Sequence, residues 1–121
     1  MKTKEFRELA LQALKEIPRQ FRDRLGRLEI IIEDRPDPEL LAELGLNQGD
    51  LLFGLYQGVP RTEKSFFRTE IYPDRILLFR RDILSVCRSR EEVKEEIKKT
   101  LIHEIAHHFG FSESQIRKWG Y

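Results

Sequence analysis

The 121-residue sequence contains a single cysteine, Cys87, so no internal disulfide can form. A disulfide scaffold is therefore excluded, and the lone thiol agrees with a reducing compartment. Long apolar runs are also missing: the longest, residues 51–56, contains a glycine and falls far short of the roughly 18–20 residues that span a bilayer. The first residues lack the uninterrupted apolar core of a signal peptide. We therefore expect a cytoplasmic protein without a membrane partner.

The chain also lacks an excess of charge of either sign. Charged residues make up 36% of the chain, yet 22 basic and 21 acidic side chains leave a formal charge of only +1. Proteins that bind nucleic acids or membrane surfaces usually carry a large field of one sign, so this balance argues against both kinds of partner. The length predicts one domain over residues 1–121; nothing in the composition indicates an oligomeric state.

Two stretches have the spacing of amphipathic helices. In residues 4–17 apolar side chains recur at intervals of three and four, and Pro18 follows, which predicts a helix that ends there. The longer signal covers residues 91–109, with Ser89 as the candidate N-cap and Gly110 as the stop.

Two shorter helices are marked by their first residues. Asp37 followed by Pro38 is typical of an N-cap and a first helical residue, which predicts a helix over residues 39–44. Ser112 and Gln115 have the S-x-x-Q spacing of a capping box, which predicts a terminal helix that starts at Ser112.

Three segments favour strands. Residues 27–33 contain consecutive isoleucines, and residues 51–57 and 75–79 each follow a turn signal. A further strand fragment is expected within residues 66–71. Together the elements predict an α+β fold, in which the N-terminal helix and the long helix pack on a small twisted sheet.

The chemistry is concentrated in an H-E-x-x-H motif that runs from His103 to His107 within the long helix. Residues four apart lie on one helix face, so both imidazoles can bind one ion at about 2.0–2.1 Å. Zinc is the ion that this pair suits. Glu104, one residue after the first histidine, is placed to take a proton from a water that zinc acidifies.

The helix pattern supports this interpretation. An apolar stripe with one residue every four positions is expected to face the core. It consists of Val93, Ile97, Leu101 and Ile105. At about 100° per residue, His103 and His107 project away from this stripe. Glu104 falls on its margin, where a carboxylate without a partner is costly to bury, and a nearby metal site would explain it.

The H-E-x-x-H motif does not by itself identify the third metal ligand. The motif continues to a glycine, Gly110, that can turn the chain back, and then to Glu113, whose oxygen can bind zinc. An acidic residue at a helix start is also favoured without any metal. Another carboxylate or His108 is the alternative, although His108 falls near the middle of the stripe and is expected to be structural.

The stretch TLIHEIAHHFGFSE resembles the signature of the small bacterial zincin-like metallopeptidase family, whose members are short minimal zincins. Residues 58–60 and the strand at 75–81 also resemble that family, so the similarity covers roughly residue 51 to the C-terminus. The resemblance implies a minimal zincin-like fold and a metal centre. It does not imply a particular substrate.

By this resemblance, His103 and His107 match the zinc ligands, Glu104 matches the catalytic carboxylate, and Glu113 matches the acidic third-ligand position. The leading hypothesis is a zinc metallopeptidase that acts on peptides or unfolded protein. Tyr56, Tyr121 and His108 are candidates for stabilising the oxyanion, and the sequence does not rank them.

Two alternatives remain open. The endoribonuclease family of rRNA maturation has the same ligand spacing, H-x-x-x-H-x-x-G-x-x-H, but this chain has Glu104 where that family has glycine and Glu113 where it has the third histidine. The near-neutral charge also weakens the RNA hypothesis. The other alternative is a zinc-binding domain with little catalytic activity, because so short a chain has little surface for a deep cleft.

Overall fold

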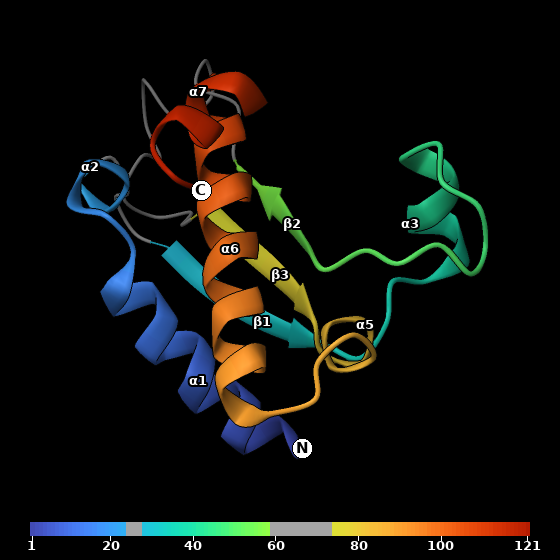
Figure 1. The fold of residues 1–121 in the computed structure, drawn as a ribbon. Helices are drawn as coiled ribbons and strands as arrows, with labels where there is room; N and C mark the ends of the chain where they lie inside the picture. Colours follow the sequence, from blue (N-terminus) through green and yellow to red (C-terminus); the bar gives the residue numbers. More distant parts are fainter. Residues whose placement is uncertain (24–27, 59–73) are drawn as a thin grey trace, which may run out of the picture.

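The computed structural model describes residues 1–23, 28–58 and 74–121 (Figure 1). The strand fragment expected within residues 66–71, and the first residue of the strand expected at 27–33, lie outside these ranges. Among the described helices, none combines the length and the apolar composition that crossing a bilayer requires.

The described strands form one mixed sheet with the order β1-β3-β2. β1 (Leu28–Glu33) runs parallel to the central strand β3 (Asp74–Phe79), and β2 (Gly54–Gln57) pairs antiparallel with the other side of β3. β2 is shorter than the predicted 51–57, because its neighbour β3 ends at Phe79 and offers no strand to pair with beyond that residue.

Two helices cover one face of this sheet. α1 (Thr3–Glu16) and α6 (Arg90–His108) pack against each other and share one core with the strands (Figure 1). Successive side chains of β3 point to opposite faces of the sheet, so every second one faces the helices and joins this core. The expected α+β architecture is therefore confirmed. The core includes Phe6, Leu9, Ala10 and Ala13 of α1, Ile97, Leu101 and Ile105 of α6, and Ile76 and Leu78 of β3.

The ends of α6 follow the predicted signals. The Ser89 side chain accepts a hydrogen bond from a backbone N–H of the first turn. At the other end Gly110 has a φ of 86°, the left-handed conformation that glycine adopts without strain. Phe111 N–H donates to the Ala106 oxygen at 2.9 Å and Gly110 N–H donates to the His107 oxygen at 3.0 Å. This pair of bonds is a Schellman motif, and it reverses the chain after the helix.

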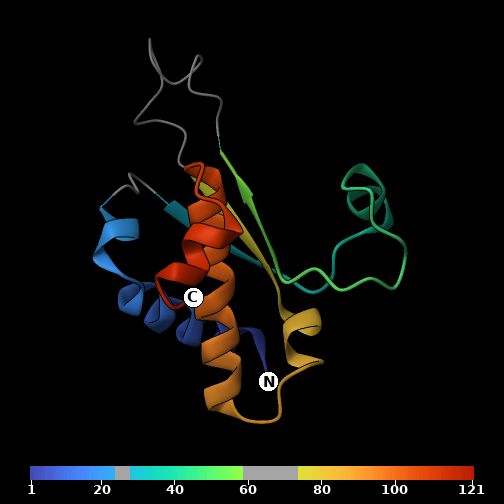
Figure 2. The same cartoon turned by 45° about the horizontal axis from the view of Figure 1, so that its top comes forward.

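Two further helix starts are confirmed. α3 (Pro38–Glu43) begins after Asp37, whose carboxylate accepts a backbone hydrogen bond. α7 (Glu113–Lys118) begins with the reciprocal capping box of Ser112 and Gln115. Figure 2 shows that α7 returns alongside the last turns of α6, while α3 stands apart from the sheet.

Two short helices were not predicted. α2 (Arg19–Arg22) follows α1 directly and places Phe21, which is fully buried, against the C-terminal residues. α5 (Arg80–Leu84) follows β3 without a break, so the last two residues of the strand expected at 75–81 by resemblance are helical instead. Such single turns carry almost no periodicity, because four or five residues are too few to repeat a helical spacing.

Candidate metal centre

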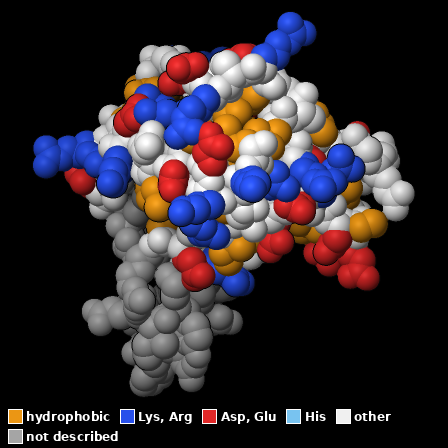
Figure 3. Space-filling model, turned by 90° about the horizontal axis from the view of Figure 1, so that it is seen from below, with side chains coloured by type: hydrophobic (Ala, Val, Ile, Leu, Met, Phe, Trp, Pro, Cys, Tyr) orange, Lys and Arg blue, Asp and Glu red, His pale blue; other side chains and the backbone are white. Residues whose placement is uncertain are grey.

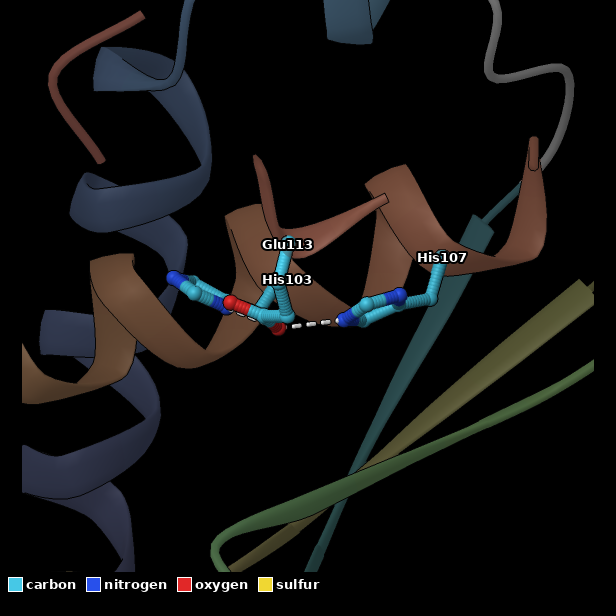
Figure 4. Close-up of side chains that lie close together, drawn as sticks. All are labelled: His103, His107 and Glu113. Atoms are coloured by element: carbon cyan, nitrogen blue, oxygen red, sulfur yellow. Dashed lines mark hydrogen bonds and ion pairs between the residues drawn. The ribbon is translucent and has the colours of Figure 1, made fainter. Parts of the chain in front are cut away.

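The structure brings His103, His107 and Glu113 together at the end of α6. The two histidines lie one helical turn apart, and Glu113 is the first residue of α7. Its Oε1 atom lies between the rings, 3.1 Å from His103 Nδ1 and 2.6 Å from His107 Nε2 (Figure 4). One ligand atom from each residue falls within 4.8 Å of the others. The three predicted metal ligands therefore share one site.

Both local and distant contacts place Glu113. The turn at Gly110 directs the chain back toward α6, as the sequence predicted. A cluster of aromatic rings then holds α7: Phe21 lies 6.2 Å from Phe111 and 5.7 Å from Trp119, centroid to centroid, and Phe111 lies 5.0 Å from Trp119. The edge-to-face geometry is the arrangement that aromatic pairs prefer. Sequence reasoning missed this cluster, because Phe21 lies in the unpredicted helix α2.

The cluster of candidate ligands faces solvent and includes a negative charge. The side chains of His103, His107 and Glu113 are 25%, 44% and 47% exposed. Hydrogen bonds from His107 and then His103 lower the pKa of the Glu113 carboxyl below its usual value. Glu113 therefore stays ionised at neutral pH, which is the state in which a carboxylate binds a metal.

The donor set suits zinc. Two imidazoles and one carboxylate are a known set of three protein ligands that leaves a fourth position open. Ligand atoms around a tetrahedral zinc stand roughly 3.3–3.6 Å apart, so the 2.6 Å contact between His107 and Glu113 would have to lengthen to hold the ion. His103 Nε2 lies 3.2 Å from the main-chain oxygen of Tyr121. A carbonyl in this position can hold the ring of a metal-binding histidine in one orientation.

Glu104 belongs to the same helix turn but faces the sheet. Its Oε1 accepts a hydrogen bond of 3.0 Å from the Tyr56 backbone N–H on β2. Burial raises the pKa of the Glu104 carboxyl, and the Tyr56 N–H and the two nearby histidines partly offset this rise. The half-buried position agrees with the predicted margin of the apolar stripe, and the partner that such a carboxylate requires is a backbone group of β2.

At three positions in register, α6 lies close to β2 or to the residue that follows it. A Cβ atom at Gly54 would lie 2.6 Å from Thr100 Cγ2, and one at Gly58 would lie 2.5 Å from His108 Cε1. Between these glycines, Tyr56 bonds to Glu104. Four helix residues rise about 6.0 Å and two strand residues about 6.8 Å, so the spacings match. The absence of side chains at both glycines lets the helix approach the strand.

His108 lies against the sheet and outside the metal cluster. Its ring stacks on Tyr56 with centroids 3.9 Å apart. The Tyr56 hydroxyl donates to Asp74 Oδ2 at 2.7 Å, and burial together with this carboxylate raises the pKa of the Tyr56 phenol. His108 is exposed, so it does not lie in the core that its place near the middle of the apolar stripe predicted, and its structural role stays a prediction. The Tyr56 hydroxyl is bonded to Asp74.

Comparisons with known proteins identify the family and a similar fold. The sequence profile of a family described as zincin-like metallopeptidase matches residues 25–121, which extends further toward the N-terminus than the resemblance noted from residue 51. A conserved hypothetical protein (TTHA0227) from Thermus thermophilus has a similar solved structure, with a TM-score of 0.58 and 25% sequence identity. The match covers 89% of this chain and 94% of that chain. No curated protein matches the sequence significantly.

Proposed function

Because the chain belongs to the zincin-like metallopeptidase family, we propose that it is a zinc-dependent hydrolase of peptide bonds. The observation that carries the proposal is the meeting of His103, His107 and Glu113 at an accessible point, with the Glu104 carboxylate one residue away on α6. When bound, zinc would act as a Lewis acid that polarises the substrate carbonyl and acidifies water.

The remaining roles, metal binding and proton transfer, are assigned to different residues of the chain. His103, His107 and Glu113 would hold the ion. Glu104 accepts the proton of the attacking water and passes it to the leaving amine. The Tyr56 N–H fixes one oxygen of this carboxylate, so the base is oriented before substrate binds.

The exposure of the cluster favours an extended substrate. Both His107 and Glu113 are more than two-fifths exposed, and a site so close to the surface is accessible to an unfolded segment. We therefore propose peptides or unfolded protein as the substrate class. The whole chain has a formal charge of only +1, and basic and acidic side chains are interspersed on the face seen from below in Figure 3. Phosphate binding depends instead on clusters of lysine and arginine.

A cleavage assay with two substrates tests this function. The purified chain, loaded with zinc, is incubated with an unstructured polypeptide and, separately, with a structured RNA. The proposal predicts zinc-dependent cuts in the polypeptide and none in the RNA, and His107→Ala should abolish them. Zinc-dependent cleavage of RNA alone would establish the nuclease alternative, and zinc binding without any cleavage would establish a binding domain with little activity.

A further inference from the structure

A cavity of 260 Å³ adjoins the candidate metal centre. One wall is the segment that enters β2, and the other is the α6 face that ends in His103 and Glu104. A larger cavity, of 420 Å³, lies along α6 near Cys87 and includes neither of these two residues. Of these two cavities, the smaller is the one that His103 and Glu104 line.

The lining of this cavity is mainly apolar. Leu51, Leu52 and Phe53 form the β2 side, and Leu51 is 50% exposed. On the α6 side the Thr100 hydroxyl already donates to the Glu96 oxygen at 2.8 Å. Its hydrogen is therefore not available to a ligand, and its methyl group faces Gly54.

The β2 wall is fixed in place before any ligand arrives. The Leu52 N–H donates to Asp82 Oδ2 at 3.0 Å, and the Phe53 oxygen accepts from Phe79 N–H at 2.9 Å. Asp82 is buried in α5, so this anchor is part of the core. A preformed wall reduces the ordering cost of binding.

The charges in the lining do not favour an ion of either sign. Glu96 and Lys99 line the cavity with opposite charges, and the third charged side chain of the lining, Glu104, already accepts a hydrogen bond from the Tyr56 N–H and is assigned to the attacking water. A charged side chain would lose water here without gaining a dedicated partner, which costs free energy. An apolar side chain would instead cover Leu51 and Phe53, which is favourable in proportion to the area buried.

We propose that this cavity is a substrate subsite that binds a large aliphatic or aromatic side chain next to the bond to be cut. The inference rests on the proposed peptidase function, because the occupant is a side chain of the peptide that is cut beside His103 and Glu104. It defines the substrate class as peptides with a large apolar residue beside the cleavage point.

Binding can be measured without cleavage. Blocked pentapeptides Gly-Gly-X-Gly-Gly, with X as Leu, Phe, Ala, Lys or Asp, are titrated into the metal-free protein while NMR signals of Leu51 and Thr100 are followed. The Leu and Phe peptides should shift both signals, and the other three should not at the same concentration. Equal shifts for all five peptides, or none for any, would overturn the subsite.

Cleavage provides the second readout. Mass spectrometry of an unfolded protein digest should show large apolar residues enriched at one fixed position beside the cuts. Leu51→Ser should lower kcat/KM for such sites about three- to ten-fold, in keeping with the loss of apolar contact. Leu44→Ser is the matched control, because Leu44 is 42% exposed and lies outside the cavity.

The two readouts separate the possible failures. Cuts without any apolar preference, or an equal effect of both serine variants, would overturn the subsite and leave the peptidase function standing. Selective shifts with no cleavage of any polypeptide would contradict the proposed function and leave a binding cavity for apolar side chains.

Discussion

The two sides of the last turns of α6 differ in how they are built. The solvent side carries His103, His107 and Glu113, which are close in sequence and partly exposed. The sheet side carries Glu104, whose partner Tyr56 is 48 residues away on β2. The solvent side is set by helix spacing and one glycine turn, whereas the sheet side depends on how the helix packs on a strand. Zinc affinity should therefore depend on the first side and catalysis on both.

The largest effect is expected on the solvent side. His107→Ala removes one of two imidazoles, and two remaining ligands are too few for a stable zinc site. We expect zinc binding to be lost, as measured by isothermal titration calorimetry. His108→Ala is the control, because that ring stacks on Tyr56, and it should retain zinc. Loss of zinc in the control alone would reverse the assignment of the two neighbouring histidines.

Removing the third ligand should have a smaller effect. Glu113→Ala leaves both histidines in place and should weaken zinc binding by about ten- to a hundred-fold, since a single ligand is lost. A competition titration with a chelator measures this range. Unchanged affinity would assign Glu113 to the start of α7, where the helix dipole favours a carboxylate without any metal.

A change on the sheet side should separate catalysis from zinc binding. Gly54→Ala places a methyl group 2.6 Å from Thr100 Cγ2, which pushes β2 away from α6 and lengthens the bond between Tyr56 and Glu104. Overpacking of this kind costs about 1–3 kcal/mol of stability. We expect roughly ten-fold lower kcat and nearly unchanged zinc affinity.

A second substitution provides the control. Thr100→Ser removes the clashing methyl group and keeps the hydroxyl that bonds to the Glu96 oxygen. In the Gly54→Ala background it should recover part of the lost kcat; full recovery is not expected, because Leu77 O would lie 3.1 Å from the new Cβ. A single Gly54→Ala variant with full activity would show that the helix can move away from β2 without disturbing Glu104.

The smallest effect is expected on stability, when the carboxylates of Glu104 and Glu113 are compared in the metal-free protein. Burial raises the pKa of Glu104 above its ordinary value of 4.5, so the folded state binds this proton more tightly and the ionised group costs stability at neutral pH. Glu104→Gln should be at least as stable as the parent at pH 7, and the difference should vanish below about pH 4.5. Urea unfolding at pH 7 and pH 4 measures this.

Glu113 should behave in the opposite way. Its pKa is lowered, so any stability it contributes is present above its ordinary pKa and is lost as the pH falls through the folded value. Glu113→Gln should therefore show no gain at pH 7. Equal gains for both glutamine variants would mean that the two sides of α6 do not differ in burial.

The same contrast explains what the sequence could predict. The i, i+4 spacing of His103 and His107, the turn at Gly110 and the capping box at Ser112 are local patterns, and the structure has each of them. The two main helices also follow from local periodicity, and the strands follow from β-branched residues and turn signals. The candidate ligands meet because these local signals all act within one short stretch.

The remaining features depend on contacts between distant segments. Nothing near Glu104 in the sequence indicates that Tyr56 N–H is its partner, and Gly54 has no local reason to lack a side chain. Phe21 supports α7 from a helix of a single turn. Such features require the packing of α6 on the sheet, which a one-dimensional pattern does not contain.

The most direct test of the central claim is the activity of Glu104→Gln. This variant keeps the shape of the side chain and an oxygen for the Tyr56 N–H, but it removes the base. With zinc affinity measured in parallel, we expect nearly unchanged zinc binding and a fall of several orders of magnitude in the hydrolysis of unfolded polypeptide. Equal cleavage by the parent and the zinc-loaded variant would contradict the account, because it would show that Glu104 is not the catalytic base.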